Sequence, residues 1–285
     1  MVAQNVQINV LIENTKNPTN PKLEAKHGLS IYVTTTIDNN KVTVLMDTGP
    51  SPQKLLHNIN ELKIDLDKVD AVVLSHGHYD HTSGLIAVLQ QINKEIPVIG
   101  HPTVFKPKLS MMPHLRLIGA PFKSCDVESV KGVPILVRNP VKIANGITST
   151  GEVPRITNFE KVKGFWAIHK ETFVDDKMLD DQSLVIDVDD KGLIILAGCA
   201  HSGIINTVKY AQKITGNNKV YAVFGGFHLI GSNENRIQAT IDELKALSPA
   251  VVAPCHCTGR TAIKKFAEEF KDIFVSVHTG TVIKI

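Results

Sequence analysis

Ser75-His76-Gly77-His78-Tyr79-Asp80-His81-Thr82 is the stretch of this sequence that decides the fold. It follows the apolar run 69–74, which predicts a buried strand leading straight into the histidines. Histidine is not a typical loop former. With 12 histidines in 285 residues, an H-x-H-x-D-H pattern arises by chance about once in a thousand such chains. The stretch therefore indicates a functional site rather than a solvated polar loop.

The spacing within this stretch suits a pair of metal ions. His76 and His78 are two residues apart after a strand and point to one side, while Gly77 permits a tight turn between them. Asp80 and His81 begin the next helix and face a neighbouring position. One short loop can therefore supply two ligands to each of two ions that lie close together.

More ligands are needed than one loop supplies, so histidines should also follow other strands. A lone histidine after a strand is more often structural, but several such cases beside the loop favour ligation for at least two of them. The candidates, each after an apolar run, are Cys199 with His201, His228, and His256 between Cys255 and Cys257.

The remaining pattern indicates an α/β fold. Short strands give way to alternating strands and helices in each half of the chain, which predicts a four-layer α/β/β/α sandwich. Residues 102–182 carry prolines at loop density, and we interpret this segment as an insertion with a few strands over the front of the site. We expect residues 1–285 to form a single domain.

Composition excludes several classes of protein. The net charge is +3 and the basic residues are scattered, so no nucleic-acid partner is expected. No apolar run is long enough for a membrane span, and the N-terminus lacks the pattern of a secretory signal. Four cysteines suit a reducing compartment, so a cytoplasmic location is expected. The sequence does not indicate an oligomeric state.

With these motifs, the chain resembles the metallo-β-lactamase fold superfamily. The signature of that superfamily is the H-x-H-x-D-H loop after a strand, preceded by an Asp-Thr-Gly turn, here Asp47-Thr48-Gly49. More narrowly, the chain is similar to the branch that includes the dihydropteroate-synthase-like enzymes of methanopterin biosynthesis. The segments that carry the narrower resemblance are Gly151-Glu-Val-Pro-Arg155, Asp180-Asp-Gln-Ser183, Gly198-Cys-Ala-His-Ser-Gly203, Gly225-Gly-Phe-His228 and Pro254-Cys-His-Cys-Thr-Gly259.

The resemblance implies a set of ligands. One ion would be held by His76, His78 and His201, and the other by Asp80, His81 and His256. Members of the superfamily commonly place a bridging aspartate where this chain has Cys199. A thiolate there could be a soft ligand, or the residue could be a small buried apolar group.

Three further residues are assigned from the same sequence. Asp47 is expected to fix the orientation of a ligand histidine, a role compatible with that of a turn carboxylate. Cys255 and Cys257 have a spacing that is wrong for a zinc ribbon, so packing is expected for both.

The charge of such a site favours an anionic small molecule as substrate. Two divalent ions bring four positive charges, against one carboxylate and at most one thiolate. Arg155 could bind a phosphate with Glu152 in support, although these two residues could equally form a surface ion pair. His228 could contact the substrate or only pack. Asp80, by resemblance, both binds metal and steers the reacting water.

These observations lead to four hypotheses about function. The first is a dinuclear metal-dependent hydrolase acting on a phosphorylated or diphosphorylated small molecule. The second is a transferase in which diphosphate leaves a pterin-methyl carbon and an arylamine attacks. An iron-dependent redox protein and a metal-stabilised binding protein are the others. Zinc is the favoured metal, and manganese, iron, cobalt or magnesium are alternatives.

Overall fold

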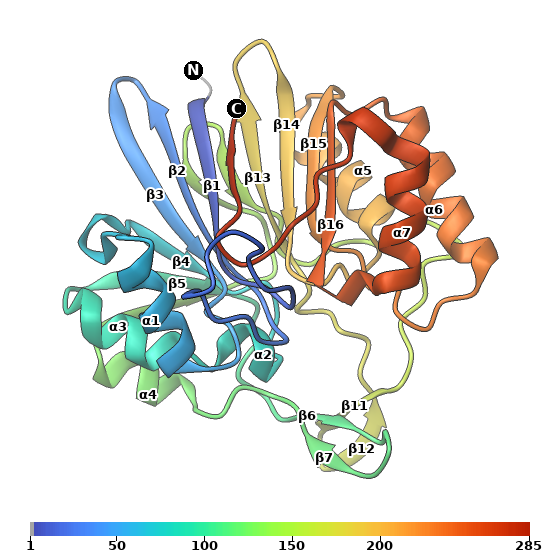
Figure 1. Cartoon of the computed structure of the whole chain (residues 1–285). Coiled ribbons are helices and arrows are strands. Elements are labelled where there is room, and N and C mark those ends of the chain that lie inside the picture. The colour runs from blue at the N-terminus through green and yellow to red at the C-terminus, as the bar shows by residue number, and fades with distance from the viewer. Residues whose placement is uncertain (1–2) are drawn as a thin grey trace.

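Two large β-sheets pack face to face in the computed structural model, which describes residues 3–285 (Figure 1). The first sheet has seven strands in the order β17-β1-β2-β3-β4-β5-β8. Strands β3, β4, β5 and β8 run parallel to one another, and the others are antiparallel. The strands are β1 (Gln4–Ile12), β2 (Ser30–Ile37), β3 (Asn40–Met46), β4 (Ala71–Val73), β5 (Ile96–Gly100), β8 (Gly132–Leu136) and β17 (Val282–Lys284).

The second sheet has six strands in the order β16-β15-β14-β13-β10-β9. Strands β14, β15 and β16 are parallel, as expected for strands joined by crossover helices. The strands are β9 (Val141–Ala144), β10 (Ile147–Ser149), β13 (Ser183–Val188), β14 (Gly192–Ala197), β15 (Val220–Gly226) and β16 (Val251–Cys255).

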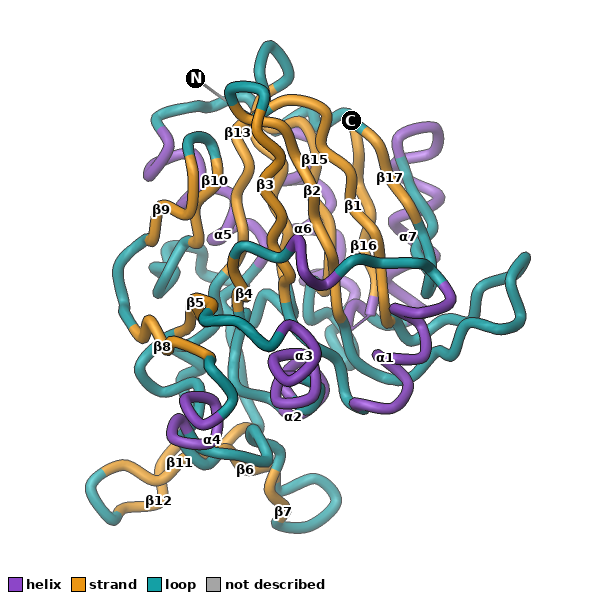
Figure 2. Tube along the Cα trace, turned by 90° about the vertical axis from the view of Figure 1, so that its left-hand side faces the viewer, coloured by secondary structure: helices purple, strands orange, loops and turns teal. Residues whose placement is uncertain are grey.

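Helices cover the outer face of each sheet. Figures 1 and 2 show α1, α3 and α4 beside the first sheet and α5, α6 and α7 beside the second. The helices are α1 (Pro52–Glu61), α2 (Tyr79–Thr82), α3 (Leu85–Ile92), α4 (Ser124–Ser129), α5 (Ile204–Thr215), α6 (Glu234–Ala246) and α7 (Arg260–Phe270), with 3-10 turns η1 (Leu66–Lys68), η2 (His256–Thr258) and η3 (Lys271–Ile273). This arrangement confirms the predicted α/β/β/α sandwich.

Three apolar layers hold the sandwich together. The central layer lies between the sheets and includes Ile8, Val33, Leu196 and Phe224, all essentially buried. A second layer lies under α1 and α3, and a third under α5, α6 and α7. Burial of this apolar area supplies the main driving force for folding. No helix among residues 3–285 is long and apolar enough to cross a membrane.

Only part of segment 102–182 lies outside the two main sheets. A separate four-stranded sheet, in the order β12-β11-β6-β7, projects from the sandwich (Figure 1). Its strands are β6 (Lys108–Ser110), β7 (Arg116–Leu117), β11 (Phe165–His169) and β12 (Thr172–Asp175). In contrast, β8 forms an edge of the first sheet, and β9 and β10 extend the second. Pro134 lies within β8, and an edge strand tolerates proline because one row of its N–H groups needs no partner.

The last strand of the chain, β17, lies at an edge of the first sheet, and Phe274 before it makes an isolated bridge to Val252. The carboxyl ends of β4, β14, β15 and β16 are followed by His76, His201, His228 and His256, respectively. Strand ends in α/β folds are where sites are built.

Candidate metal centre

His76, His78 and His201 form a compact group of imidazoles. One ring nitrogen from each lies within 4.8 Å of the others, and His76 Nε2 is 3.0 Å from His78 Nδ1. His78 Nε2 and both ring nitrogens of His201 are buried, and within the described part of the chain they have no hydrogen-bond partner. Buried polar atoms normally have partners. These nitrogens therefore fit a group that is bound between the rings.

Asp80, His81 and His256 form a second group. The Nε2 atoms of His81 and His256 are 3.2 Å apart, and they lie 3.8 and 3.6 Å, respectively, from Asp80 Oδ2. Asp80 and His81 come from the short helix α2, whereas His256 begins η2. One carboxylate and two imidazoles at these separations match the donors of a divalent ion.

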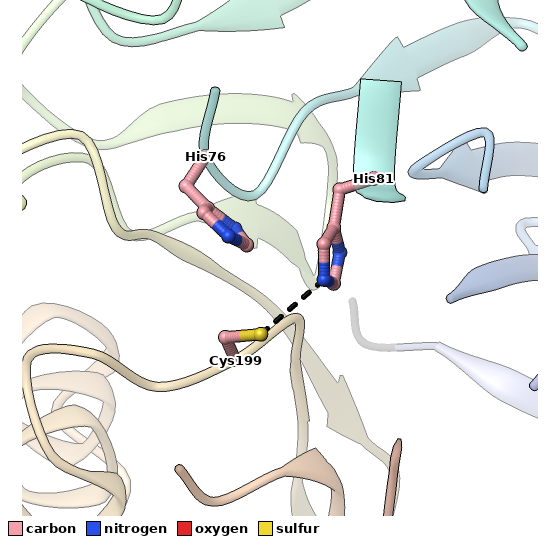
Figure 3. A group of neighbouring side chains, drawn as sticks. All are labelled: His76, His81 and Cys199. Atoms are coloured by element: carbon pink, nitrogen blue, oxygen red, sulfur yellow. Dashed lines mark hydrogen bonds between the residues drawn. The ribbon is translucent and has the colours of Figure 1, made fainter. Parts of the chain in front are cut away.

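Cys199 lies between the two groups. Its Sγ is 3.2 Å from His81 Nε2, and Figure 3 shows this sulfur directed toward His81 with His76 beside it. The sulfur also lies within 4.8 Å of a ring nitrogen of His201 and one of His228. Burial raises the pKa of the Cys199 thiol well above its ordinary value. A bound cation would favour the thiolate instead, so both roles proposed for Cys199 are compatible with its position.

Packing was expected for both Cys255 and Cys257, but only Cys255 lies in an apolar layer. Cys255 is part of the apolar layer between the sheets. Cys257 faces the site instead, because its Sγ lies within 4.8 Å of the Cys199 sulfur and of a ring nitrogen of His256. Its thiol also donates to the Cys199 carbonyl at 3.4 Å. The 3-10 turn η2 separates the directions of the two cysteines, which the spacing alone did not reveal.

Asp47 connects the two groups of predicted ligands. Its carboxylate accepts hydrogen bonds from the Ser75 backbone N–H at 2.7 Å and from Ser75 Oγ at 2.6 Å. The same carboxylate lies 2.6 Å from His81 Nδ1, and Ser75 Oγ lies 2.9 Å from His76 Nδ1. Because Nδ1 of His81 is engaged, its Nε2 is left to face the centre of the site.

His256 is held by the two residues that follow β1. Glu13 Oε1 accepts the His256 backbone N–H at 2.7 Å. Asn14 donates to the His256 carbonyl at 2.9 Å, and its Oδ1 lies 2.9 Å from His256 Nδ1. The backbone of His256 has φ +47°, a region that costs energy for a residue with a side chain. Such a conformation persists only where its surroundings fix it.

The segment Asp180-Asp-Gln-Ser183 braces the two loops of the first group. Asp180 accepts the Gly77 N–H at 2.8 Å and pairs with the buried Lys108 at 2.8 Å. Asp181 accepts the Ser202 N–H at 2.8 Å. The Gln182 N–H donates to the Ser75 carbonyl at 2.8 Å. This segment carried part of the resemblance in sequence, and its contacts explain why it lies beside the ligands.

The five histidines predicted as ligands differ in the direction of their pKa shifts. Burial lowers the pKa of His76 and His201, lowers that of His78 to about 3 and that of His256 to about 4. Burial also opposes the charge on His81, but the carboxylates of Asp47 and Asp80 outweigh it and raise its pKa to about 9. A metal binds the neutral imidazole, so burial favours the form of His76, His78, His201 and His256 that a metal binds.

Sequence reasoning missed His27. Its Nε2 lies 3.2 Å from Asp80 Oδ2, and its ring centroid is 4.9 Å from that of His256. The side chain is 57% exposed, so it stands at the open side of the second group. A lone histidine before Gly28 in a loop has no spacing signal, and only the fold brings it to Asp80.

Three predicted substrate contacts have different outcomes. Glu152 Oε2 lies 3.2 Å from His101 Nε2, and Arg155 donates to the Met178 carbonyl at 3.2 Å. Within residues 3–285, neither of the two forms a hydrogen bond or ion pair with the six predicted metal ligands. His228 does reach the site, with its ring centroid 4.1 Å from that of His201.

Gly198→Ala is expected to disturb the packing of Ser75 and Asp47 beside the site. A Cβ at this position would collide with Ser75 and lie 3.0 Å from Asp47 Oδ2. We expect the free energy of unfolding to fall by about 1–3 kcal/mol, as for overpacking in a core, and metal content to fall with it. Thermal unfolding and metal analysis test this. Normal metal content in a destabilised variant would show that Gly198 affects packing alone.

Comparison with known proteins agrees with this architecture. The model of the Metallo-beta-lactamase superfamily matches residues 27–256. A 7,8-dihydropterin-6-methyl-4-(beta-D-ribofuranosyl)-aminobenzene-5'-phosphate synthase of Methanocaldococcus jannaschii is 39% identical, over 98% of this chain and 97% of that protein.

Two solved structures are similar in fold. Tm1679, a metal-dependent hydrolase of the beta-lactamase superfamily, is 27% identical with a TM-score of 0.81, covering 98% of this chain and 99% of the other. A diphosphatase from the PhnP family is 13% identical with a TM-score of 0.50, covering 99% and 98% of the two chains. The second likeness concerns the fold alone.

Proposed function

Because this chain belongs to the metallo-β-lactamase superfamily, a superfamily of metal-dependent enzymes, we propose that it uses two divalent ions to join a pterin-methyl carbon to an arylamine nitrogen. His76, His78 and His201 hold one ion, and Asp80, His81 and His256 hold the other. Zinc is the favoured metal for this donor set.

The convergence of these two groups is the observation that supports the proposal. Side chains from three separate regions of the chain meet, with donor atoms within 4.8 Å of one another in the first group and 3.2 to 3.8 Å apart in the second. Several buried ring nitrogens there lack partners among the residues described. Two bound divalent ions would stabilise negative charge on a leaving oxygen, or lower the pKa of a water. Cys199 is placed to contact either ion.

The choice of transfer over hydrolysis comes from the archaeal relative. That relative is named as a synthase whose product joins a dihydropterin-methyl group to a ribofuranosyl-aminobenzene phosphate. In the proposed reaction the C–O bond to diphosphate breaks, a C–N bond forms, and the amine gives up a proton to water. The substrate is anionic, which suits a site where metal charge exceeds ligand charge.

The residues of the chain position the reacting groups. Asp47 fixes the direction of His81, and Glu13 with Asn14 fixes that of His256. Asp80 lies between His256 and His27, where a carboxylate can orient the attacking nucleophile.

Hydrolysis of an anionic phosphate ester is the second candidate. The observation that favours it is the 27% identical structure of a metal-dependent hydrolase, which this chain matches over almost its full length. Hydrolysis would use the same two groups, with water in place of the amine.

A requirement for the amine separates the two candidates. Metal-loaded protein is incubated with a pterin-methyl diphosphate, with and without an arylamine such as a ribofuranosyl-aminobenzene phosphate. We expect coupled product, and diphosphate release at least about tenfold faster with the amine, because the amine is the proposed nucleophile. Protein treated with a chelator is the control. Equal release in water alone, yielding the pterin alcohol, would establish hydrolysis instead.

A further inference from the structure

A basic pocket adjoins the first group of histidines. It has a volume of about 770 Å³ and is lined by residues that include Lys161, Lys163, His228, Asn233 and Arg236. We call this the His228 pocket. His228 lies at its inner side, because the His228 ring packs 4.1 Å from that of His201, and Cys199, His201 and His228 have donor atoms within 4.8 Å of one another.

The charge of the His228 pocket is of one sign. Of the described residues that line it, three are lysine or arginine and none is acidic. The nearby Glu160 carboxylate accepts the backbone N–H groups of Ile205 and Asn206 at 2.9 Å each, and its single negative charge, which interacts with Arg236, does not balance the three basic residues. Glu234 pairs with Lys265 at 3.2 Å. The pocket therefore keeps a net positive charge.

Two nitrogen atoms in the pocket are buried without hydrogen-bond partners among the described residues. Arg236 Nε and His228 Nδ1 have no hydrogen-bond partner in the described part of the chain. Arg236 uses a different atom, Nη1, to donate to the Lys161 carbonyl at 2.9 Å, which holds the lysine segment against α6. The first turn of the 13-residue helix α6 also lines the pocket, and a helix N-terminus favours an anion.

We propose that the His228 pocket binds a phosphate or diphosphate group of the substrate and delivers the reacting end to the metal centre. This inference deepens the proposed function and rests on it for the identity of the substrate. Arg236 provides a planar guanidinium that suits phosphate oxygens, while Lys161 and Lys163 add charge at the exposed rim. We place the anion at α6 rather than at Arg155 because Arg236 lines the pocket beside His228, whereas Arg155 does not line it.

Binding of inorganic anions tests this proposal. Calorimetry measures the affinity of full-length protein for inorganic diphosphate and for phosphate, with and without bound metal. The double variant Lys161→Gln/Lys163→Gln should bind diphosphate about tenfold more weakly in both forms, the loss expected for one charge-assisted contact. Lys213→Gln, an exposed lysine on α5 outside the pocket, is the matched control and should bind like the parent protein.

A second variant tests the inner donor. Arg236→Gln should weaken binding at least as much as the lysine double variant, and Arg236→Lys should restore part of it. Thermal unfolding shows whether each variant is folded. Affinity for diphosphate that is unchanged in the lysine and arginine variants overturns the proposal, even if the enzyme turns over. Weaker binding in the variants without any turnover by the parent protein supports the pocket and contradicts the proposed reaction.

The two anions also separate the parts of the substrate. Tighter binding of diphosphate than of phosphate, lost in the variants, assigns the pocket to the leaving group. Equal affinity for both, lost in the same variants, assigns it to a single phosphate such as that on the arylamine acceptor.

Discussion

Replacement of Asp80 by asparagine is expected to lower the turnover number by about a thousandfold, while substrate still binds. Asparagine keeps the shape of the side chain but removes the charge that lies within 4 Å of His27, His81 and His256. Loss of a positioned group that acts in the transition state commonly costs a factor of 10² to 10⁴, roughly. Steady-state kinetics and equilibrium binding of the substrate, measured side by side, test this.

Asp187→Asn is the matched control for this substitution. Asp187 lies on β13 and accepts a hydrogen bond from Asn217 at 2.8 Å, away from the histidines. We expect its activity to remain near that of the parent protein. If Asp80→Asn kept full activity with both ions bound, Asp80 would have no part in the chemistry. If the parent protein bound substrate without converting it, the chain would be a metal-stabilised binding protein.

Removal of the metal is expected to abolish activity and lower the melting temperature by about 10 °C. A ligand present at a thousand times its Kd stabilises a fold by about 4 kcal/mol, and each kcal/mol shifts the melting temperature by roughly 2–4 °C in a protein larger than 150 residues. The ions are expected to stabilise the fold because each group of donors joins separate parts of the chain, so that the ions bind only when these parts are assembled. Calorimetry before and after chelation measures the shift.

His201→Ala is expected to remove one of the two bound ions. It removes one ring of the first group, so we expect about one ion per chain instead of two by metal analysis. His114→Ala, an exposed histidine in the loop after β6, is the control and should retain both ions. Two tightly bound ions in His201→Ala would contradict the assignment of His201 as a ligand.

Sequence periodicity was enough to predict most strands and helices of the sandwich. The strand before His76 and the strands before Cys199 and His256 could be identified because each is an apolar run followed by polar residues. The parallel strands β14 and β16 place His201 and His256 at one edge of the second sheet, and the packing of the two sheets brings this edge to the loop that follows β4 in the first sheet. The edge strand β8 was not identified from the sequence because it contains Pro134, a residue that an edge strand nevertheless tolerates.

The rest of the site depends on contacts between distant segments. His27 reaches Asp80 across a loop, and Asp180 reaches Gly77 across more than a hundred residues. Such contacts leave no periodic pattern in the sequence. Arg155 matched the composition of a phosphate site, but it does not line the His228 pocket. Arg236 was overlooked because an arginine on an amphipathic helix is ordinarily a solvated residue.

The contacts of Glu13 and Asn14 with His256 have a consequence for folding. These two residues lie more than 240 positions before the histidine that they contact. A chain truncated before residue 201 would lack a predicted ligand of each group. The full set of predicted donors therefore assembles only when both halves of the sandwich have folded, so we expect folding to precede metal loading.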